Sequence, residues 1–173
     1  MKGLSSTKTD QSVGEIVRVC IIYDTKRGST EKVAHWMAEA IRDVAEVKVA
    51  RVTESPNVDD CDLVVIGAPI YYERPLPSVI EFIRSRNGFD GKGVAVFILC
   101  IADKFGKLGK KYTEARYMRL MTEPIKGEII AKRVFDGWIL RENIDLRPLV
   151  QDWIKRVLRA FQKGEIIDGI EHP

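Results

Sequence analysis

The chain has 173 residues, of which 45% are hydrophobic and 31% charged, and its formal net charge is +3. This size and composition suit a single globular domain with a full hydrophobic core. The small charge gives no reason to expect nucleic-acid binding, and no apolar run approaches the ~18 residues of a membrane-spanning helix.

The amino-terminal segment shows no sign of export. Its first sixteen residues contain no apolar block typical of a secretory signal. We therefore interpret residues 1–15 as a flexible tail and expect a cytoplasmic protein.

After this tail, short β-branched apolar segments alternate with longer amphipathic ones. Strands are predicted at 16–23, 47–52, 63–67, 94–100 and 129–140. Helices are predicted at 29–44, between Pro77 and Asn87, at 112–122, and after Asp145, which can cap the last helix. Residues 164–173 are expected to form an irregular carboxyl-terminal tail.

This alternation with short connections predicts an α/β fold, a three-layer sandwich whose five-stranded parallel sheet is covered by helices on both faces. Residues 16–163 form this domain. In such sheets ligands bind beyond the carboxyl ends of the strands, where the strand order reverses. The loops after residues 23, 67 and 100 are therefore the candidate site.

The cysteines and histidines do not indicate a metal site. Cys20, Cys61 and Cys100 are far apart, and each lies in or beside an apolar strand. We expect buried free thiols in a reducing compartment. His35 and His172 cannot form a metal site alone, and no cluster has ligand spacing, so no metal is expected.

The loop between the first strand and the first helix has the chemistry of a phosphate site. It brings together three hydroxyls, two cations and a glycine, namely Thr25, Lys26, Arg27, Gly28, Ser29 and Thr30. The helix that follows adds unpaired backbone N–H groups and the positive end of its dipole. The P-loop and dinucleotide fingerprints are both absent. The alternative is that Ser29 or Thr30 only caps the helix.

Two segments resemble the flavodoxin family. TKRGST at 25–30 resembles its phosphate loop, [ST]-x-[TR]-G-x-T, and LVVIGAPIYYERPLPSVIEFI at 63–83 resembles its third strand and following loop. The order of elements also matches over 16–162, which implies a flavodoxin-like fold with strand order 2-1-3-4-5. Within the family, the short basic form with IGA and an aromatic pair looks most like the menaquinone-dependent protoporphyrinogen oxidase branch.

The resemblance implies FMN as the cofactor, with the loop at 25–30 holding its phosphate. The isoalloxazine ring would contact Pro69, Ile70, Tyr71 and Tyr72 on one side, and Cys100, Ile101, Ala102 and Asp103 at its pyrimidine end. Ordinary packing is the alternative for the two tyrosines. Two features depart from the family: Glu73 stands where glycine is common, and the third loop lacks G-x-G-D.

Three functions fit these features: an FMN oxidoreductase, which by the resemblance would pass electrons from a porphyrinogen to a quinone; a flavodoxin-type electron carrier; and a cofactor-free interaction module. Electron carriers of this type are typically acidic, whereas the segment near the third loop is basic through Lys104, Lys107, Lys110, Lys111, Arg116 and Arg119. This favours an oxidoreductase whose basic surface meets an anionic substrate, a partner or anionic lipid. No catalytic side chain is identified, because the redox chemistry belongs to the cofactor.

Overall fold

The computed structural model describes residues 14–86, 88–101 and 106–173. Its strands are β1 (Arg18–Tyr23), β2 (Glu46–Arg51), β3 (Leu63–Tyr71), β4 (Arg74–Pro75), β5 (Gly93–Cys100), β6 (Glu128–Asp136) and β7 (Ile170–Glu171). Its helices are α1 (Ser29–Ile41), α2 (Pro77–Arg84), α3 (Lys107–Thr122) and α4 (Leu146–Lys163), with a short 3-10 turn η1 (Val52–Glu54).

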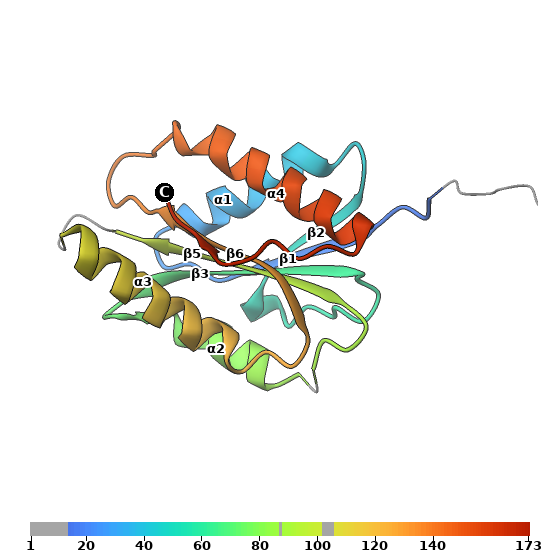
Figure 1. The fold of residues 1–173 in the computed structure, drawn as a ribbon, viewed down its shortest axis with the longest axis horizontal. Coiled ribbons are helices and arrows are strands. Elements are labelled where there is room, and N and C mark those ends of the chain that lie inside the picture. The colour runs from blue at the N-terminus through green and yellow to red at the C-terminus, as the bar shows by residue number, and fades with distance from the viewer. Residues whose placement is uncertain (1–13, 87, 102–105) are drawn as a thin grey trace, which may run out of the picture.

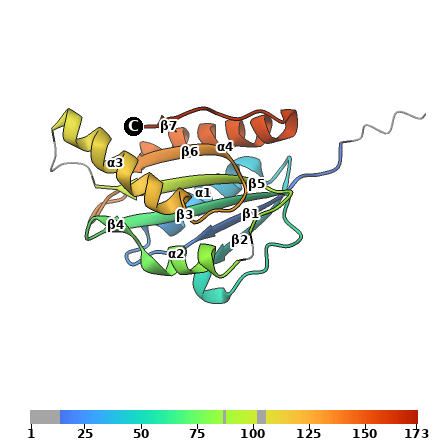
Figure 2. The same ribbon diagram turned by 60° about the horizontal axis from the view of Figure 1, so that its bottom comes forward.

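The five long strands form a parallel sheet in the order β2-β1-β3-β5-β6. Figures 1 and 2 show α1 and α4 on one face of this sheet and α2 and α3 on the other. The predicted three-layer sandwich is therefore confirmed, with the predicted order 2-1-3-4-5 for its long strands. Two short strands are additional: β4 pairs antiparallel with β3, and β7 lies parallel to β6 at the outer edge.

The central strand β3 is buried on both faces, because its alternate side chains enter two separate core clusters. Leu63 and Val65 pack with α1 and α4, whereas Val64 and Ile66 pack with α2 and α3. At Gly67 a Cβ atom would lie only 2.0 Å from an aromatic ring of β5. Glycine therefore lets β3 and β5 stay closely paired up to their carboxyl ends, where the candidate site lies.

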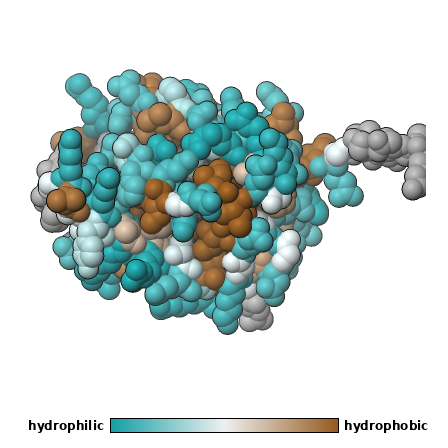
Figure 3. All heavy atoms as spheres, viewed as in Figure 1, coloured by the Kyte–Doolittle hydropathy of each residue, from teal (hydrophilic) through white to brown (hydrophobic). Residues whose placement is uncertain are grey.

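The segment after α4, expected to be irregular, packs along the outer edge of the sheet. The Ile167 N–H donates to a carbonyl of β6 at 2.8 Å. The Glu171 carboxylate accepts hydrogen bonds from Arg156 at 2.6 Å and from Arg133 at 3.3 Å. In Figure 3, hydrophobic atoms gather near the centre of the face that this segment crosses in Figure 1. The segment therefore covers an edge strand that would otherwise be open.

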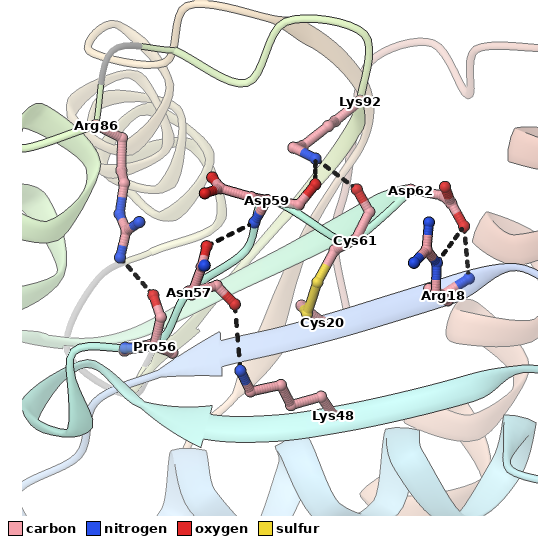
Figure 4. Close-up of a disulfide and its surroundings, with 10 residues drawn as sticks. All are labelled: Arg18, Cys20, Lys48, Pro56, Asn57, Asp59, Cys61, Asp62, Arg86 and Lys92. Atoms are coloured by element: carbon pink, nitrogen blue, oxygen red, sulfur yellow. Dashed lines mark hydrogen bonds and ion pairs between the residues drawn. A yellow bond between two sulfur atoms is a disulfide. The ribbon is translucent and has the colours of Figure 1, made fainter.

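The expectation of free thiols is wrong for two of the three cysteines. Cys20 of β1 and Cys61, which precedes β3, form a disulfide with their Cα atoms 5.9 Å apart (Figure 4). Lys92 donates from its ammonium group to the carbonyls of Asp59 and Cys61, both at 2.7 Å. These contacts fix the segment between η1 and β3 to the sheet. Cys100 is a free, half-buried thiol.

Within the described ranges, none of the helices has the length and apolar character needed to cross a bilayer. The same ranges hold no group of three His, Cys, Asp or Glu side chains arranged to bind a metal ion. His35 is exposed on α1.

Candidate functional site

The loop after β1 turns sharply into α1 at a glycine. Gly28 is the N-cap of α1 and has φ 91, in the left-handed region that favours glycine. Its N–H donates to the Thr25 Oγ1 atom at 2.9 Å. A Cβ atom on Gly28 would meet nothing within 4 Å. Glycine is therefore required here by the backbone conformation and not by crowding from neighbouring atoms. The space beside Gly28 is open for a ligand.

The hydroxyls at the start of α1 do not cap this helix. Its amino terminus has no side-chain capping hydrogen bond, although Ser29 and Thr30 are both buried there. The Thr30 Oγ1 atom is fully enclosed and has no hydrogen-bond partner among the described residues. A buried hydroxyl of this kind, beside the unpaired N–H groups of a helix, fits an oxygen-rich anion. The structure therefore disfavours the capping alternative.

A buried carboxylate that sequence analysis did not identify anchors this loop. Asp24 accepts hydrogen bonds from Arg51 Nε at 2.6 Å, from the Thr25 N–H at 2.8 Å and from the Ser78 hydroxyl. Arg51 also donates to the Thr25 carbonyl at 2.6 Å. Burial alone would raise the pKa of Asp24, but the hydrogen bonds from Ser78, Arg51 and Thr25 outweigh it and hold the pKa below its ordinary value. The loop is thus tied to both β2 and α2.

The loop after β3 is a tight hairpin. Tyr71 pairs with Arg74 across β3 and β4, which leaves Tyr72 and Glu73 as the two turn residues. Both have positive φ, 50 and 60 respectively, as a type I′ turn requires. The family's common glycine at the position of Glu73 suits this conformation. The turn leaves Tyr72 88% exposed, whereas Tyr71 is half-buried.

The loops after β1 and β3 meet through Lys26. Its ammonium nitrogen lies 5.2 Å from the ring centroid of Tyr71 and 5.8 Å from that of Tyr72, within the range of cation–π attraction. A charged loop and an aromatic hairpin are therefore neighbours, as the candidate site requires.

Six of the fourteen predicted site residues line a small cavity at the carboxyl ends of the strands. Its walls come from the start of α1 and the loop before it, from the ends of β3 and β5, and from the segments after β5 and β6. They consist of Arg27, Ser29, Pro69, Ile70, Tyr71, Leu99, Ile101, Gly137, Trp138 and Ile139. Sequence analysis did not identify four of these wall residues, Leu99, Gly137, Trp138 and Ile139. The Trp138 ring packs against Trp36 of α1 at a tilt of 32°, with ring centroids 5.8 Å apart. Ala102 and Asp103 lie outside the described residues.

Cys100 ends β5 beside this cavity. Burial and, to a lesser extent, the nearby Glu114 carboxylate raise the pKa of its thiol to about 11. The thiol is therefore protonated at neutral pH and is a poor nucleophile. Its place at the strand end suits packing against a ligand.

Sequence and structure comparisons connect this arrangement to known proteins. Residues 20–146 match the family described as Flavodoxin domain. Coenzyme F420H2 oxidase from Methanothermobacter marburgensis is 35% identical over 78 residues, which make up 41% of this chain but only 19% of that protein.

Two solved structures share the fold. Flavodoxin from Fusobacterium nucleatum, bound to flavin mononucleotide, aligns with a TM-score of 0.62 at 17% identity, over 83% of this chain and 98% of that chain. Rubredoxin oxygen:oxidoreductase from Desulfovibrio gigas aligns with a TM-score of 0.55 at 21% identity, over 84% of this chain and 36% of that chain.

Proposed function

We propose that this chain, which belongs to the flavodoxin family, binds FMN and functions as an FMN-dependent oxidoreductase. The proposal rests mainly on the loop at 25–30. There Gly28 adopts a left-handed backbone conformation at the start of α1, and the buried Thr30 hydroxyl has no hydrogen-bond partner among the described residues. When bound, FMN supplies one- and two-electron redox chemistry.

Different residues of the loop would have different roles in binding a phosphate. The N–H groups at the start of α1, together with the Ser29 and Thr30 hydroxyls, are the donors. Lys26 and Arg27 are exposed and add positive charge around the dianion. The ion pair of Asp24 with Arg51 holds the loop in place without contributing a phosphate ligand.

The aromatic hairpin and the end of β5 would hold the isoalloxazine ring. The half-buried ring of Tyr71 and the exposed ring of Tyr72 offer stacking surfaces on one side. Ile101, which is 42% exposed, offers an apolar contact on the other. Tyr71 and Ile101 line the same cavity, which supports this placement.

The charge around the site favours an oxidoreductase over an electron carrier. Lys26, Arg27, Lys107 and Lys111 are all exposed near the carboxyl ends of the strands. Positive charge stabilises fully reduced, anionic flavin and so favours two-electron chemistry. The names of two longer relatives, an F420H2 oxidase and an oxygen oxidoreductase, agree with this class. Because the chain also shares the fold of the F. nucleatum flavodoxin, an electron carrier is the second candidate function.

The identity of the electron donor and the electron acceptor is a more specific part of the proposal. A porphyrinogen donor and a quinone acceptor follow only from the resemblance to the protoporphyrinogen oxidase branch, and the relatives named above do not support that branch. The basic surface is compatible with an anionic substrate. Turnover of a porphyrinogen with a quinone acceptor, measured against a sample lacking FMN, tests this choice directly.

Titration of the apo-protein with FMN, followed by the visible spectrum and by quenching of flavin fluorescence, tests the proposed function. We expect Gly28→Val to weaken binding at least about tenfold, because valine rarely adopts positive φ and obstructs the phosphate approach. Gly91→Val is the matched control: Gly91 has φ 73 and open surroundings, but lies in the loop before β5 at the opposite end of the sheet. If a folded Gly28→Val protein binds FMN as tightly as Gly91→Val does, the phosphate is not held at this loop.

A further inference from the structure

The side of α3 that faces solvent carries both cations and large apolar side chains. Positions 108, 112, 115 and 119 recur every three or four residues, so they form one exposed line along the helix, with further cations on both sides of it. We call this side the outer face of α3, and it consists of Lys107, Leu108, Lys111, Tyr112, Ala115, Arg116 and Arg119. The core residues of the helix, Tyr117, Met118 and Met121, lie on its other side. Figures 1 and 2 show α3 in the outer layer that covers one face of the sheet.

Two large side chains of the outer face add little to the core. Leu108 is 88% exposed and Tyr112 is 73% exposed. They are four positions apart and therefore project next to each other from the beginning of the helix. A single exposed leucine is ordinary on a protein surface, but neighbouring apolar side chains flanked by Lys and Arg are typical of helices that lie on a membrane surface.

The cations of the outer face are not neutralised by carboxylates. The ion pairs of the described residues include none of its four cations, Lys107, Lys111, Arg116 and Arg119. The first turn of α3 has no acidic residue and begins with Lys107, although the helix dipole favours acidic side chains at that end. The positive charge of the face therefore does not serve the helix itself, and it is available to an anionic partner.

A lipid bilayer suits this face better than an acidic protein does. A protein partner usually anchors its strongest contacts in a pocket. The cavities of about 260 and 360 Å³ beside α3 are lined by residues from its other sides, namely Lys110, Thr113, Glu114, Tyr117 and Leu120. Projecting leucine and tyrosine side chains instead enter a fluid headgroup layer, while long basic side chains reach the acidic headgroups around them.

We propose that the outer face of α3 docks on an anionic lipid bilayer. Leu108 and Tyr112 enter the headgroup region, and the four cations contact acidic headgroups. The helix lies on the bilayer and does not cross it. The proposal goes beyond cofactor binding and does not depend on it, because none of these residues is proposed to contact FMN.

Sedimentation with lipid vesicles tests the proposal. Vesicles of equal parts phosphatidylcholine and phosphatidylserine are compared with vesicles of phosphatidylcholine alone, at low and at high salt. The full chain is used with and without saturating FMN. We expect much tighter binding to the anionic vesicles, which weakens as the salt concentration rises. If the chain does not bind the anionic vesicles at low salt, the proposal is wrong. If FMN does not bind, the proposed function fails, and sedimentation without FMN still decides whether α3 docks on lipid.

A pair of double variants locates the surface. Lys107→Gln with Lys111→Gln should weaken vesicle binding at least about tenfold, because each basic residue near an anionic leaflet contributes about fivefold. Lys155→Gln with Arg159→Gln is the matched control. It removes the same charge from two exposed positions with the same spacing, but on α4 at the opposite face of the sheet. Equal losses in the two double variants would show that overall charge drives binding, which overturns the assignment to α3.

A third double variant distinguishes lipid from an acidic protein. Leu108→Ser with Tyr112→Ser should weaken binding to anionic vesicles about tenfold, because it removes the apolar contacts with the bilayer. Its binding to soluble poly-glutamate, which has the charge but no apolar layer, should not change. Circular dichroism checks that each variant is folded. Vesicle binding that is unchanged in a folded Leu108→Ser, Tyr112→Ser protein would overturn the lipid assignment and favour an acidic protein as the partner.

Discussion

Asp24 and Arg51 form an ion pair that joins the carboxyl ends of β1 and β2, with Nε 2.6 Å from Oδ1. Arg51 also binds the carbonyl of Thr25, the first residue of the proposed phosphate loop. The pair therefore controls the position of a loop whose own side chains remain available for a ligand. This gives Asp24 a role in cofactor binding without contact with the cofactor.

Asp24→Asn should destabilise the protein and weaken FMN binding together. Loss of hydrogen bonds to a buried charged group typically costs about 1.5–3 kcal/mol, and here it also releases the loop. Urea unfolding and FMN titration measure the two effects. Glu39→Gln breaks the exposed ion pair with Arg147 and is the control, expected to cost at most about 1 kcal/mol. Unchanged FMN affinity in Asp24→Asn would show that the ion pair does not position the loop.

The contribution of Asp24 should disappear in acid. Its pKa in the folded protein lies below the ordinary value of 3.8, so the carboxylate is ionised and stabilising above that value. As the pH falls through the folded pKa, the group gains a proton and the stabilisation is lost. The difference in unfolding free energy between the wild type and Asp24→Asn should therefore be constant near neutral pH and shrink below about pH 4. A difference that grows on acidification contradicts this sign.

Glu73→Gly should stabilise the hairpin after β3. Glu73 has φ 60, and the left-handed conformation costs a non-glycine residue roughly 1–2 kcal/mol. The greater freedom of glycine in the unfolded chain offsets part of the gain, so we expect about 0.5–1 kcal/mol in urea unfolding. Glu73→Ala removes the same charge but keeps the strain and should gain little. An equal gain from both variants would attribute the effect to charge.

The disulfide should contribute substantially to stability. It joins Cys20 and Cys61 across 41 residues, and a cross-link of this span typically adds about 2–4 kcal/mol. Cys61→Ser should lower the unfolding free energy by that amount in oxidised samples and by little in the presence of a thiol reductant. Cys100→Ser is the control, since this thiol is free and its replacement should not change the dependence on reductant. Equal stability of oxidised and reduced wild type would contradict the expectation.

The predictable parts of the fold are those whose signal lies in residues that are consecutive in the sequence. The continuous apolar runs of β3 and β5 indicate strands covered on both faces, and their order along the chain identifies the sheet. The phosphate loop was predictable because Gly28 and its hydroxyl neighbours occupy six consecutive positions, 25–30. Such signals do not depend on which distant residues come together.

The features that sequence analysis did not find depend on distant pairs. Arg51 lies 27 positions from Asp24, and Ser78 lies 54 positions from it. β7 has only two residues, too few for any periodicity, and is held by backbone pairing with β6. In the sequence Glu114 is one acidic residue in a basic segment, whereas in the structure it is buried on α3 together with Tyr117. Only the packed structure distinguishes such a residue from a solvated one.

The charge of Lys26 should set the redox behaviour of the bound cofactor. Its ammonium group lies within 6 Å of both tyrosine rings that the isoalloxazine is proposed to contact. At ~7 Å and an effective dielectric near 20, two unit charges interact by roughly 2 kcal/mol, and exposure to water and salt reduces this. Positive charge makes the second electron easier to add, so the two one-electron potentials should lie close together, as an oxidoreductase needs.

Lys26→Glu should therefore lower the second potential by tens of millivolts, on the order expected after screening, and leave the first less affected. Lys163→Glu makes the same charge change at the far end of α4 and should shift neither potential appreciably. Spectroelectrochemical titration at low and high salt measures the two potentials in each variant. The shift in Lys26→Glu should become smaller as the salt concentration rises. Because this site is lined by cations, the two potentials of the wild-type protein should lie close together. A second potential far below the first, as negative surroundings produce, would instead assign the chain to the electron carriers.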